Sequence, residues 1–488
     1  MVDLDWKTKV VSSEMASTAP KLSNSPRVSI PSPIRAADVL LSPASSSLCS
    51  AYEQYLRLPE LSKLWTSRDF PNWNNEPLVK PALQALEITF RLISVVQADP
   101  RPYANGHEWR RRLESLASNQ IELIALLFEE GEEAADTRGT VPIANLSTSN
   151  GVLARDGSST EVWKIHGETT VVSRTSEGSL LPRLATWQKS EDMASKILFS
   201  IECALRRCPF TLGLGEPNLA GKPLLEYDLI CRPSDLHSLK KNPFDSDHRN
   251  LSNYENQALF TTHQILESWI RASRELHARI GERIDGQNFE KAGRDCWVLE
   301  RIWKLLAEIE DLHLMMDPDD FLRLKSQLAI KASSESEAFC FRSKGLIEIT
   351  RASKNLKHKV PAILGVEVDP KGGPRIQEAA MKLYHAHSSG DLGKIHLLQA
   401  LQAIESVLKK FFFSYRQLIM IVMGSLEVKG NRGVVSAESS DALTQIFLEP
   451  TYFPSLDAAK TFLGDFWHYN PNILTSNGSN GRSVGMKH

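Results

Sequence analysis

Residues 254–270 read YENQALFTTHQILESWI and show the clearest helical pattern in the chain. Read as a helix, this stretch carries one apolar stripe that includes an imidazole. The stripe consists of Leu259, His263, Leu266 and Ile270. A lone histidine on such a stripe is more often a satisfied core residue than a functional one, so spacing alone predicts a buried amphipathic helix and no chemistry.

The same helical periodicity recurs on both sides of this stretch. The helical segments that the pattern predicts are 81–96, 107–128, 184–207, 254–284, 289–316, 318–330, 341–355, 375–387 and 393–424. One alternating segment, 161–173, has a turn at Gly167 and predicts at most one small β-hairpin. The fold class expected is therefore mainly α, a helical bundle.

Composition shifts divide the chain into five parts. They are a disordered Ser/Pro-rich tail at 1–48, an N-terminal helical region at 49–208, a Pro/Gly-rich and polar connector at 209–252, a C-terminal helical domain at 253–470 and a disordered tail at 471–488. Within the N-terminal region, the polar and Gly/Ser-rich segment 137–157 predicts a flexible surface loop, and 232–252 predicts a polar loop inside the connector.

Charge and hydropathy exclude several classes of protein. The 57 Lys and Arg residues against 59 Asp and Glu give a net charge of −2, without the basic excess that nucleic-acid binding uses. The strongest apolar run, 411–423, is too short to span a bilayer. The start of the chain lacks the pattern of a secretory signal, and the six cysteines form no CxxC pair. We expect a cytoplasmic protein, with the nucleus as a second location, and neither nucleic acid nor membrane as partner.

Two further motifs have the wrong spacing for the sites that they suggest. Gly213, Gly215 and Gly221 before Lys222 suggest a phosphate-binding loop, but the spacing is wrong and Pro223 follows the lysine. A Pro/Gly-punctuated connector is the preferred interpretation. Three histidines, His385, His387 and His396, lack the tighter pattern of a structural zinc site, so no metal is expected.

The N-terminal tail carries three Ser-Pro steps, at Ser25, Ser32 and Ser42. A proline-directed kinase would add charge there and create an epitope for arginine. These serines are candidate phosphorylation sites.

The helix at 254–270 resembles the stretch in which tryptophan dioxygenases place their distal histidine, and the matching residues are His263, Gln264, Glu267 and Trp269. Three further fragments agree in order along the chain. They are YEQYLRL at 52–58, RIWKLL through MDPDDF at 301–321, and SEAFCFR at 336–342. The resemblance covers chiefly 254–423 and implies a dioxygenase-like helical scaffold for the C-terminal domain.

Candidate ligand-binding residues follow from this resemblance. Arg342 matches the arginine that holds the substrate carboxylate, a task that suits a planar guanidinium. His263 matches the hydrogen-bonding partner of an indole or of bound oxygen, and Tyr52 belongs to the matching N-terminal fragment. A small carboxylate-bearing or indole-like ligand would fit between them.

The residue that binds haem iron on the proximal side in tryptophan dioxygenases has no counterpart in this sequence. Met420 stands at the position where the dioxygenases have it, and the loop that follows lacks their Thr/Gly-rich substrate clasp. Haem iron needs such a ligand, usually a neutral imidazole. Met420 with its apolar neighbours is interpreted as core packing. We therefore expect no haem and no enzymatic activity.

Over nearly the whole chain the sequence resembles the plant nematode-resistance-protein-like (HSPRO) family. The segments that carry this resemblance are AYEQYLRLPEL at 51–61, RTSEGSLLPRLATWQKSED at 174–192, TLGLGEPNL at 211–219 and VEVDPKGGP at 366–374. It implies a non-enzymatic regulator of plant basal defence and of stress or energy signalling. The implied partner is the regulatory βγ subunit of a sucrose-non-fermenting-related kinase.

Three hypotheses stay open at this point. The first is a regulator that binds proteins and retains a small-ligand pocket near His263 and Arg342. The second is a haem-dependent indole-oxidising dioxygenase with its iron ligand elsewhere, His396 being the nearest helical candidate. The third is a plain scaffold with the Ser-Pro tail as its partner site. The dioxygenase resemblance also admits a homo-oligomer, through the element at 52–58.

Overall fold

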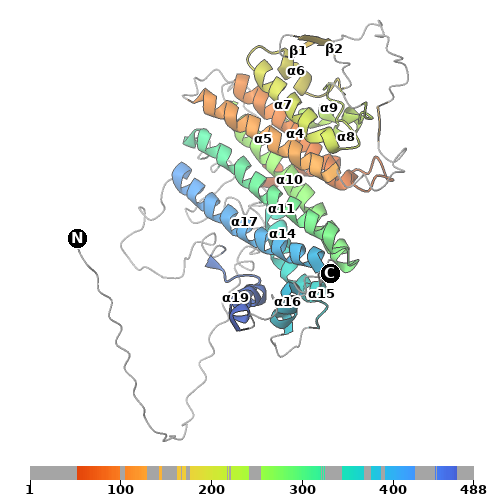
Figure 1. Cartoon of the computed structure of the whole chain (residues 1–488). Helices are drawn as coiled ribbons and strands as arrows, with labels where there is room; N and C mark the ends of the chain where they lie inside the picture. The colour runs from red at the N-terminus through yellow and green to blue at the C-terminus, as the bar shows by residue number, and fades with distance from the viewer. Residues whose placement is uncertain are drawn as a thin grey trace, which may run out of the picture. The chain divides into compact units, whose positions relative to one another are not determined.

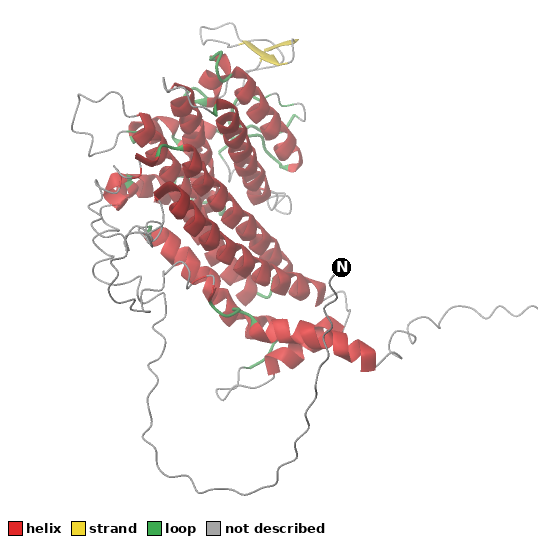
Figure 2. Cartoon of the chain, turned by 90° about the vertical axis from the view of Figure 1, so that its left-hand side faces the viewer, coloured by secondary structure: helices red, strands yellow, loops and turns green. Residues whose placement is uncertain are grey.

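In the computed structural model, the segment that begins at residue 254 forms one long helix, α10 (Tyr254–Asp285). It packs against α4 (Glu76–Ala98) on one side and against α11 (Phe289–Asp311) on the other. Helix α17 (Leu392–Met423) packs along α11, and α5 (Gly106–Phe128) along α4. Figures 1 and 2 show these long helices side by side. The prediction of a mainly helical fold is confirmed.

The structure describes most of the helical part of the chain. The described residues are 52–98, 105–128, 142–144, 162–165, 168–171, 176–216, 218, 221–240, 254–319, 321, 324, 343–367, 375–385, 391–423, 446 and 448–469. All of them belong to one compact unit, Ala36–His488. The predicted tails at 1–48 and 471–488, the candidate serines Ser25, Ser32 and Ser42, and Arg342 lie outside the described residues.

Shorter elements complete the N-terminal half. They are α3 (Leu58–Thr66), α6 (Leu181–Thr186), α7 (Glu191–Ala204), the 3₁₀ helix η2 (Leu205–Arg207), α8 (Tyr227–Cys231) and α9 (Pro233–Ser238). Helix α7 packs on α5, while α6, α8 and α9 contact α4. The strands β1 (Val162–Ile165) and β2 (Glu168–Val171) pair antiparallel, in the segment for which the sequence predicts a hairpin.

The C-terminal half adds further short elements around the long helices. They are η3 (Leu312–Met315), α14 (Lys344–Asn355), η5 (Leu356–Lys359), α15 (Val360–Leu364), α16 (Arg375–His385) and α19 (Pro454–Tyr469). Helix α14 packs on α10, and α16 packs on α19. Within the described residues no helix is both long and apolar enough to cross a membrane.

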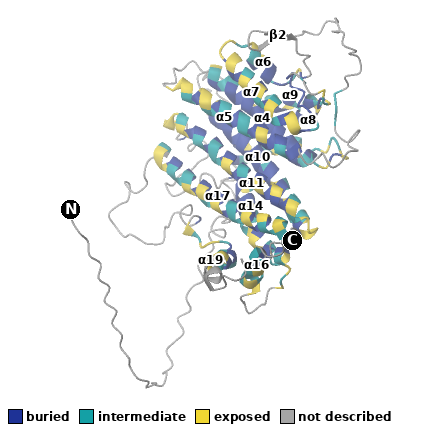
Figure 3. Cartoon of the chain, in the orientation of Figure 1, coloured by how far each residue is buried: buried dark blue, intermediate teal, exposed yellow. Residues whose placement is uncertain are grey.

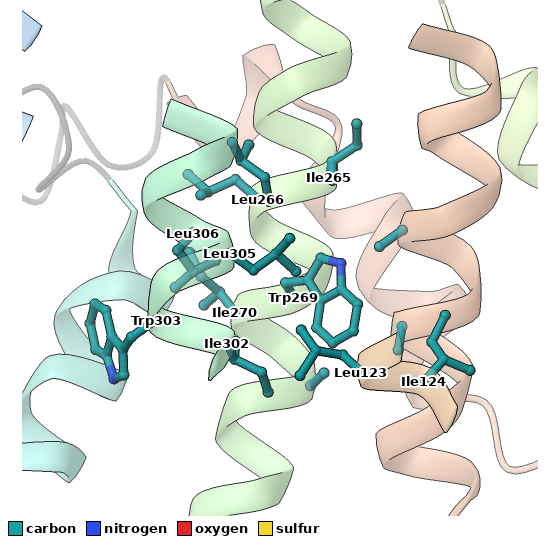
Figure 4. Close-up of a cluster of buried hydrophobic side chains, with 14 of the residues drawn as sticks. Leu123, Ile124, Ile265, Leu266, Trp269, Ile270, Ile302, Trp303, Leu305 and Leu306 are labelled. Carbon is teal, nitrogen blue, oxygen red and sulfur yellow. The ribbon is translucent and has the colours of Figure 1, made fainter. Parts of the chain in front are cut away.

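The core is centred on α10. Trp269 is fully buried, and its indole N–H donates to Gln120 Oε1 on α5 at 2.9 Å. Figure 4 shows this indole next to Leu123 and Ile124, with Leu266 and other aliphatic residues toward α11. Buried faces line the inside of the long helices in Figure 3, with exposed residues on the outer faces. The stripe predicted at 254–270 is therefore part of a continuous apolar core.

The segment predicted as one helix at 184–207 is split. Ser190 explains the break, because its hydroxyl donates to the carbonyl oxygen of Leu184 at 2.9 Å and its backbone N–H to that of Trp187 at 2.8 Å. The chain turns there between α6 and α7. A side chain that satisfies nearby backbone groups competes with helix continuation.

The segment predicted as a connector at 209–252 contains α8 and α9, so the polar loop expected at 232–252 is interrupted by a helix. Pro233 at the first position of α9 favours this, because its missing N–H is not needed there. The glycine-rich part is also packed, since Leu212 and Leu214 are fully buried.

The rejected phosphate-loop motif does hold an anion, but the anion comes from the chain itself. Glu216 accepts backbone N–H bonds from Leu212 at 2.8 Å, Gly213 at 3.1 Å and Leu214 at 2.7 Å. Gly213 and Gly215 have φ angles of 71° and 96°, in the left-handed region that favours glycine. Internal capping by Glu216 thus explains why glycines occur here.

The interpretation of Met420 as core packing is wrong. Met420 is 38% exposed and its neighbour Ile421 is 68% exposed. They lie near the end of α17, where only one side of the helix packs on α11 and η3. In the loop predicted at 137–157, the described residues are 142–144, and Ile143 forms a bridge with Leu225.

Candidate functional site

His263 lies in the middle of the core on α10, with 2% of its surface exposed. The ring of His313, from η3, stacks on it with 4.9 Å between ring centroids and 27° between planes. Tyr52 approaches the imidazole edge-on, at 5.8 Å between centroids. The fold thus brings together two of the sequence-predicted positions, Tyr52 and His263, and adds a second imidazole.

Hydrogen bonds fix the proton positions on the two rings. His263 Nδ1 is 2.8 Å from the carbonyl oxygen of Leu259, and a carbonyl only accepts, so Nδ1 carries the proton. Nε2 of His263 is then an acceptor. His313 Nδ1 lies 2.9 Å from Glu310 Oε2 and donates to that carboxylate. His313 Nε2 is buried and has no hydrogen-bond partner among the described residues.

Burial sets the charge of His263. Loss of solvent, and then the neighbouring His313, lower the pKa of His263 to about 4. At neutral pH the ring is therefore uncharged. Such a ring accepts a hydrogen bond at Nε2, for example from an indole N–H. In this tautomer it has no Nε2 proton to donate to bound oxygen.

Glu267 lies one turn along α10 and forms the second part of the site. Hydroxyl groups of Ser343 and Tyr52 hydrogen-bond to its carboxyl group, while Oε1 is buried without a partner. Burial raises its pKa to about 7. The same burial, with Glu267 nearby, raises the pKa of Tyr52 well above its usual value. We call Tyr52, His263, Glu267, Glu310 and His313 the histidine cluster.

The histidine cluster is tightly enclosed on the side of α14. Ser343 caps this helix by accepting from the backbone N–H of Leu346 at 2.9 Å. A Cβ at Gly345 would lie 2.6 Å from Ile270 Cγ2 and 3.4 Å from Glu267 Oε2. Glycine is therefore required for α14 to approach α10 this closely.

The other two residues of the dioxygenase-like motif connect helices. Gln264 donates to the carbonyl oxygen of Leu56 at 3.0 Å and accepts from the guanidinium of Arg91. Trp269 donates to Gln120 as described above. Both residues are fully buried. Their roles in this structure are contacts between α10 and its neighbours.

His313 and Glu310 were missed by reasoning from the sequence. Their spacing of three residues is a detectable signal, because such residues face each other on a helix. The pairing of His313 with His263 has no local signal, since it depends on how η3 folds back over α10.

The position matched to the proximal haem ligand has no donor aimed at the histidine cluster in what the structure describes. The sulfur of Met420 accepts from Arg416 Nη1 at 3.4 Å on the exposed part of α17. His263 is meanwhile covered on one face by His313. These residues do not fit a haem held between His263 and Met420. No group of three or more His, Cys, Asp or Glu among the described residues has the arrangement of a metal site.

Comparison with protein families gives two adjoining matches. Residues 1–202 match the family described as Hs1pro-1 N-terminus, and residues 205–469 match the Hs1pro-1 protein C-terminus. No solved structure matches the chain. The tryptophan-dioxygenase-like scaffold is therefore still a prediction.

Two relatives from Arabidopsis thaliana match over almost their whole length. Nematode resistance protein-like HSPRO2 is 54% identical over 471 residues, which are 96% of this chain and 100% of the relative. Nematode resistance protein-like HSPRO1 is 52% identical over 469 residues, with 96% and 99% of the two chains covered. The chain belongs to the Hs1pro-1 family of nematode resistance protein-like proteins.

Proposed function

We propose that this chain is a non-enzymatic regulator in plant defence that acts by binding other proteins. The histidine cluster carries the proposal. Tyr52, His263 and His313 are each only 2% exposed, and their rings pack on one another. A catalytic imidazole has to contact its substrate, whereas these rings contact each other.

The relatives support the defence role. Both are named nematode resistance protein-like, and both align over the full chain. Binding as the mode of action rests on the resemblance given above. The proposed partner is the regulatory βγ subunit of a sucrose-non-fermenting-related kinase, met in the cytoplasm.

A small-ligand role for the histidine cluster is part of the proposal. His313 Nε2 and Glu267 Oε1 are buried atoms without partners, and such atoms cost free energy. A small ligand with an N–H donor would satisfy them. If His263→Ala changes neither ligand affinity nor partner affinity, this part of the proposal fails.

Haem-dependent indole oxidation is the alternative, and the geometry disfavours it. His263 donates its Nδ1 proton to Leu259 and has no Nε2 proton for oxygen. Met420 is half-exposed and bonded to Arg416.

The test measures binding and turnover on the same preparation of the full chain. Calorimetry with the purified βγ subunit should show saturable binding, and incubation of haem-supplied protein with L-tryptophan or indole should consume no substrate. If the βγ subunit does not bind and the substrate is oxidised, the regulator hypothesis fails and the dioxygenase hypothesis is favoured.

A further inference from the structure

A cavity of about 670 Å³ lies on the other side of α10 from the histidine cluster, lined by parts of α4, α6, α9 and α10. Its volume falls in the range typical of small-molecule sites. The charged residues that line it are Arg91, Glu177, Arg183 and Lys240, together with the titratable His237. Three cations thus face a single carboxylate.

Arg91 is the buried member of this set, with 5% of its surface exposed. Its Nη1 donates to the carbonyl oxygen of Leu236 at 3.1 Å, and Nη2 donates to Gln264 Oε1. Nε is buried and has no partner among the described residues. A guanidinium has five N–H donors, so three of them have no acceptor in the part of the chain that the structure describes.

No carboxylate of the described residues hydrogen-bonds to Arg91. The obvious candidate is Glu87, one turn earlier on α4, and its oxygens already have other donors. These donors are Ser179 Oγ at 2.7 Å, the Leu180 N–H at 2.7 Å, the Tyr227 hydroxyl at 3.1 Å and His237 Nε2 at 2.8 Å. Within the described residues Arg91 therefore donates only to neutral acceptors, while Glu87 acts on it through space without a hydrogen bond and raises its pKa. A buried charge without a hydrogen-bonded counterion is costly, and a bound anion would supply one.

Burial lowers the pKa of Arg91 to about 10, so the side chain is still charged at neutral pH. Arg183 and Lys240 are exposed at the cavity, and neither side chain has a hydrogen bond or ion pair in the described part of the chain. Ser94 and Thr261 add hydroxyl groups to the lining.

We propose that this cavity binds a small ligand through one anionic group, a carboxylate or a phosphate. The free N–H groups of Arg91 hold the anion at the base, in the planar geometry that a guanidinium offers to either group. Arg183 and Lys240 attract it at the opening. The proposal does not depend on partner binding by the chain.

A neighbouring cavity differs in charge, which limits the preference for an anion to the Arg91 cavity. It has a volume of about 580 Å³ and shares Glu177, Gly178 and Ser234 with the first. Asp69, Asp228 and Asp235 line it. Arg232 is the one cation among the described residues of its lining and is paired to Asp69 at 2.6 Å, so the lining is net acidic. An anion is therefore attracted to the Arg91 side and repelled from the other.

The test titrates the full chain with inorganic phosphate and, separately, with benzoate, at constant ionic strength set by chloride. A ligand that binds the native state raises the melting temperature in a saturable way. We expect saturable binding of at least one probe by calorimetry, with a matching rise in Tm. If only one of the two probes binds, that probe shows whether the cavity accepts a phosphate or a carboxylate.

Variants keep the test decisive. The double variant Arg183→Gln and Lys240→Gln changes only exposed side chains, and it should weaken binding at least fivefold. Arg91→Lys keeps the charge but loses the planar fork, and it should weaken binding further. Arg206→Gln, another exposed cation outside the cavity, serves as the control and should bind as the wild type does. The proposal is overturned if neither probe binds saturably above chloride, or if the double variant binds with unchanged affinity.

Discussion

Two polar regions lie against the same helix, α10, and burial affects the charge of their ionisable groups differently. In the histidine cluster burial disfavours charge, because it lowers the pKa of His263 to about 4 and raises that of Glu267 to about 7. In the Arg91 cavity the guanidinium stays charged and lies beside an open volume. The histidine cluster therefore offers buried hydrogen-bonding atoms to a ligand, whereas the Arg91 cavity offers a positive charge to an anion.

Gln264 links the two regions. Its amide nitrogen donates to Leu56, close in sequence to Tyr52, and its amide oxygen accepts from Arg91. Because α10 forms a wall of both regions, a change in its packing affects both, while a change on one side should affect one.

The largest expected effect is loss of both regions together. Trp269→Ala removes a fully buried indole from α10, and such a change typically costs about 3 to 5 kcal/mol of unfolding free energy. Urea unfolding followed by circular dichroism measures it. Trp297→Ala, at a residue that is 44% exposed, is the matched control and should change stability by well under half as much. Equal effects would contradict the placement of the core.

The second prediction concerns the pH dependence of the histidine cluster. The pKa of Glu267 rises from 4.5 to about 7 on folding, so its protonated carboxyl group stabilises the folded state. This contribution to the unfolding free energy is fully present below pH 4.5 and is lost as pH rises through 7. The unfolding free energy of the wild type relative to Glu267→Gln should therefore fall by about 1.4 kcal/mol per pH unit across that window.

Two histidines act in the opposite direction. Burial lowers the pKa of His263 and of His277 from 6.5 to about 4. Their contribution to the unfolding free energy is therefore lost as pH falls from 6.5 to 4. The Glu267→Gln variant should consequently lose stability more steeply in acid than the wild type does. Denaturant titrations at pH 5, 6, 7 and 8 measure both slopes, and parallel curves for the two proteins would refute a buried, raised Glu267.

A smaller effect should separate the two regions. Gly345→Ala places a Cβ at 2.6 Å from Ile270 and pushes on Glu267, and overpacking of this kind typically costs about 1 to 3 kcal/mol. Anion binding at Arg91 should stay as in the wild type. Gly106→Ala has open space around the new Cβ and serves as control. A variant at Gly345 with wild-type stability would show that α14 is not packed this closely.

The smallest effect on stability is expected at the opening of the Arg91 cavity. Arg183→Gln alone alters an exposed side chain that has no hydrogen bond or ion pair to any described residue, so the unfolding free energy should change by no more than about 0.5 kcal/mol. The affinity of the Arg183→Gln variant for the anionic probe should still be lower than that of the wild type. A large loss of stability would show that Arg183 has a structural role.

The sequence allowed the α10 helix and the burial of His263 to be predicted, because periodicity reports directly on which face is apolar. It did not reveal His313 above His263, since that contact depends on the fold of η3 after α11. Arg91 carries no local signal either, because α4 is buried over most of its length and its cavity is assembled from four separate elements.

Short-range chemistry accounts for the other differences. Ser190 breaks the predicted helix at 184–207 through side-chain hydrogen bonds, which a periodicity argument does not include. Glu216 uses the amides of the glycine-rich loop, in agreement with the rejection of that loop as a phosphate site. Met420 was expected in the core because its neighbours are apolar, but the end of α17 is exposed on that side.

We propose that the chain regulates by binding and performs no haem chemistry. The most direct measurement is an absorption spectrum with an iron assay on full-length protein expressed with a haem precursor, comparing the wild type with Met420→His and His263→Ala. We predict no Soret band and no stoichiometric iron in the wild type. A strong Soret band with bound iron that disappears in His263→Ala would contradict the account.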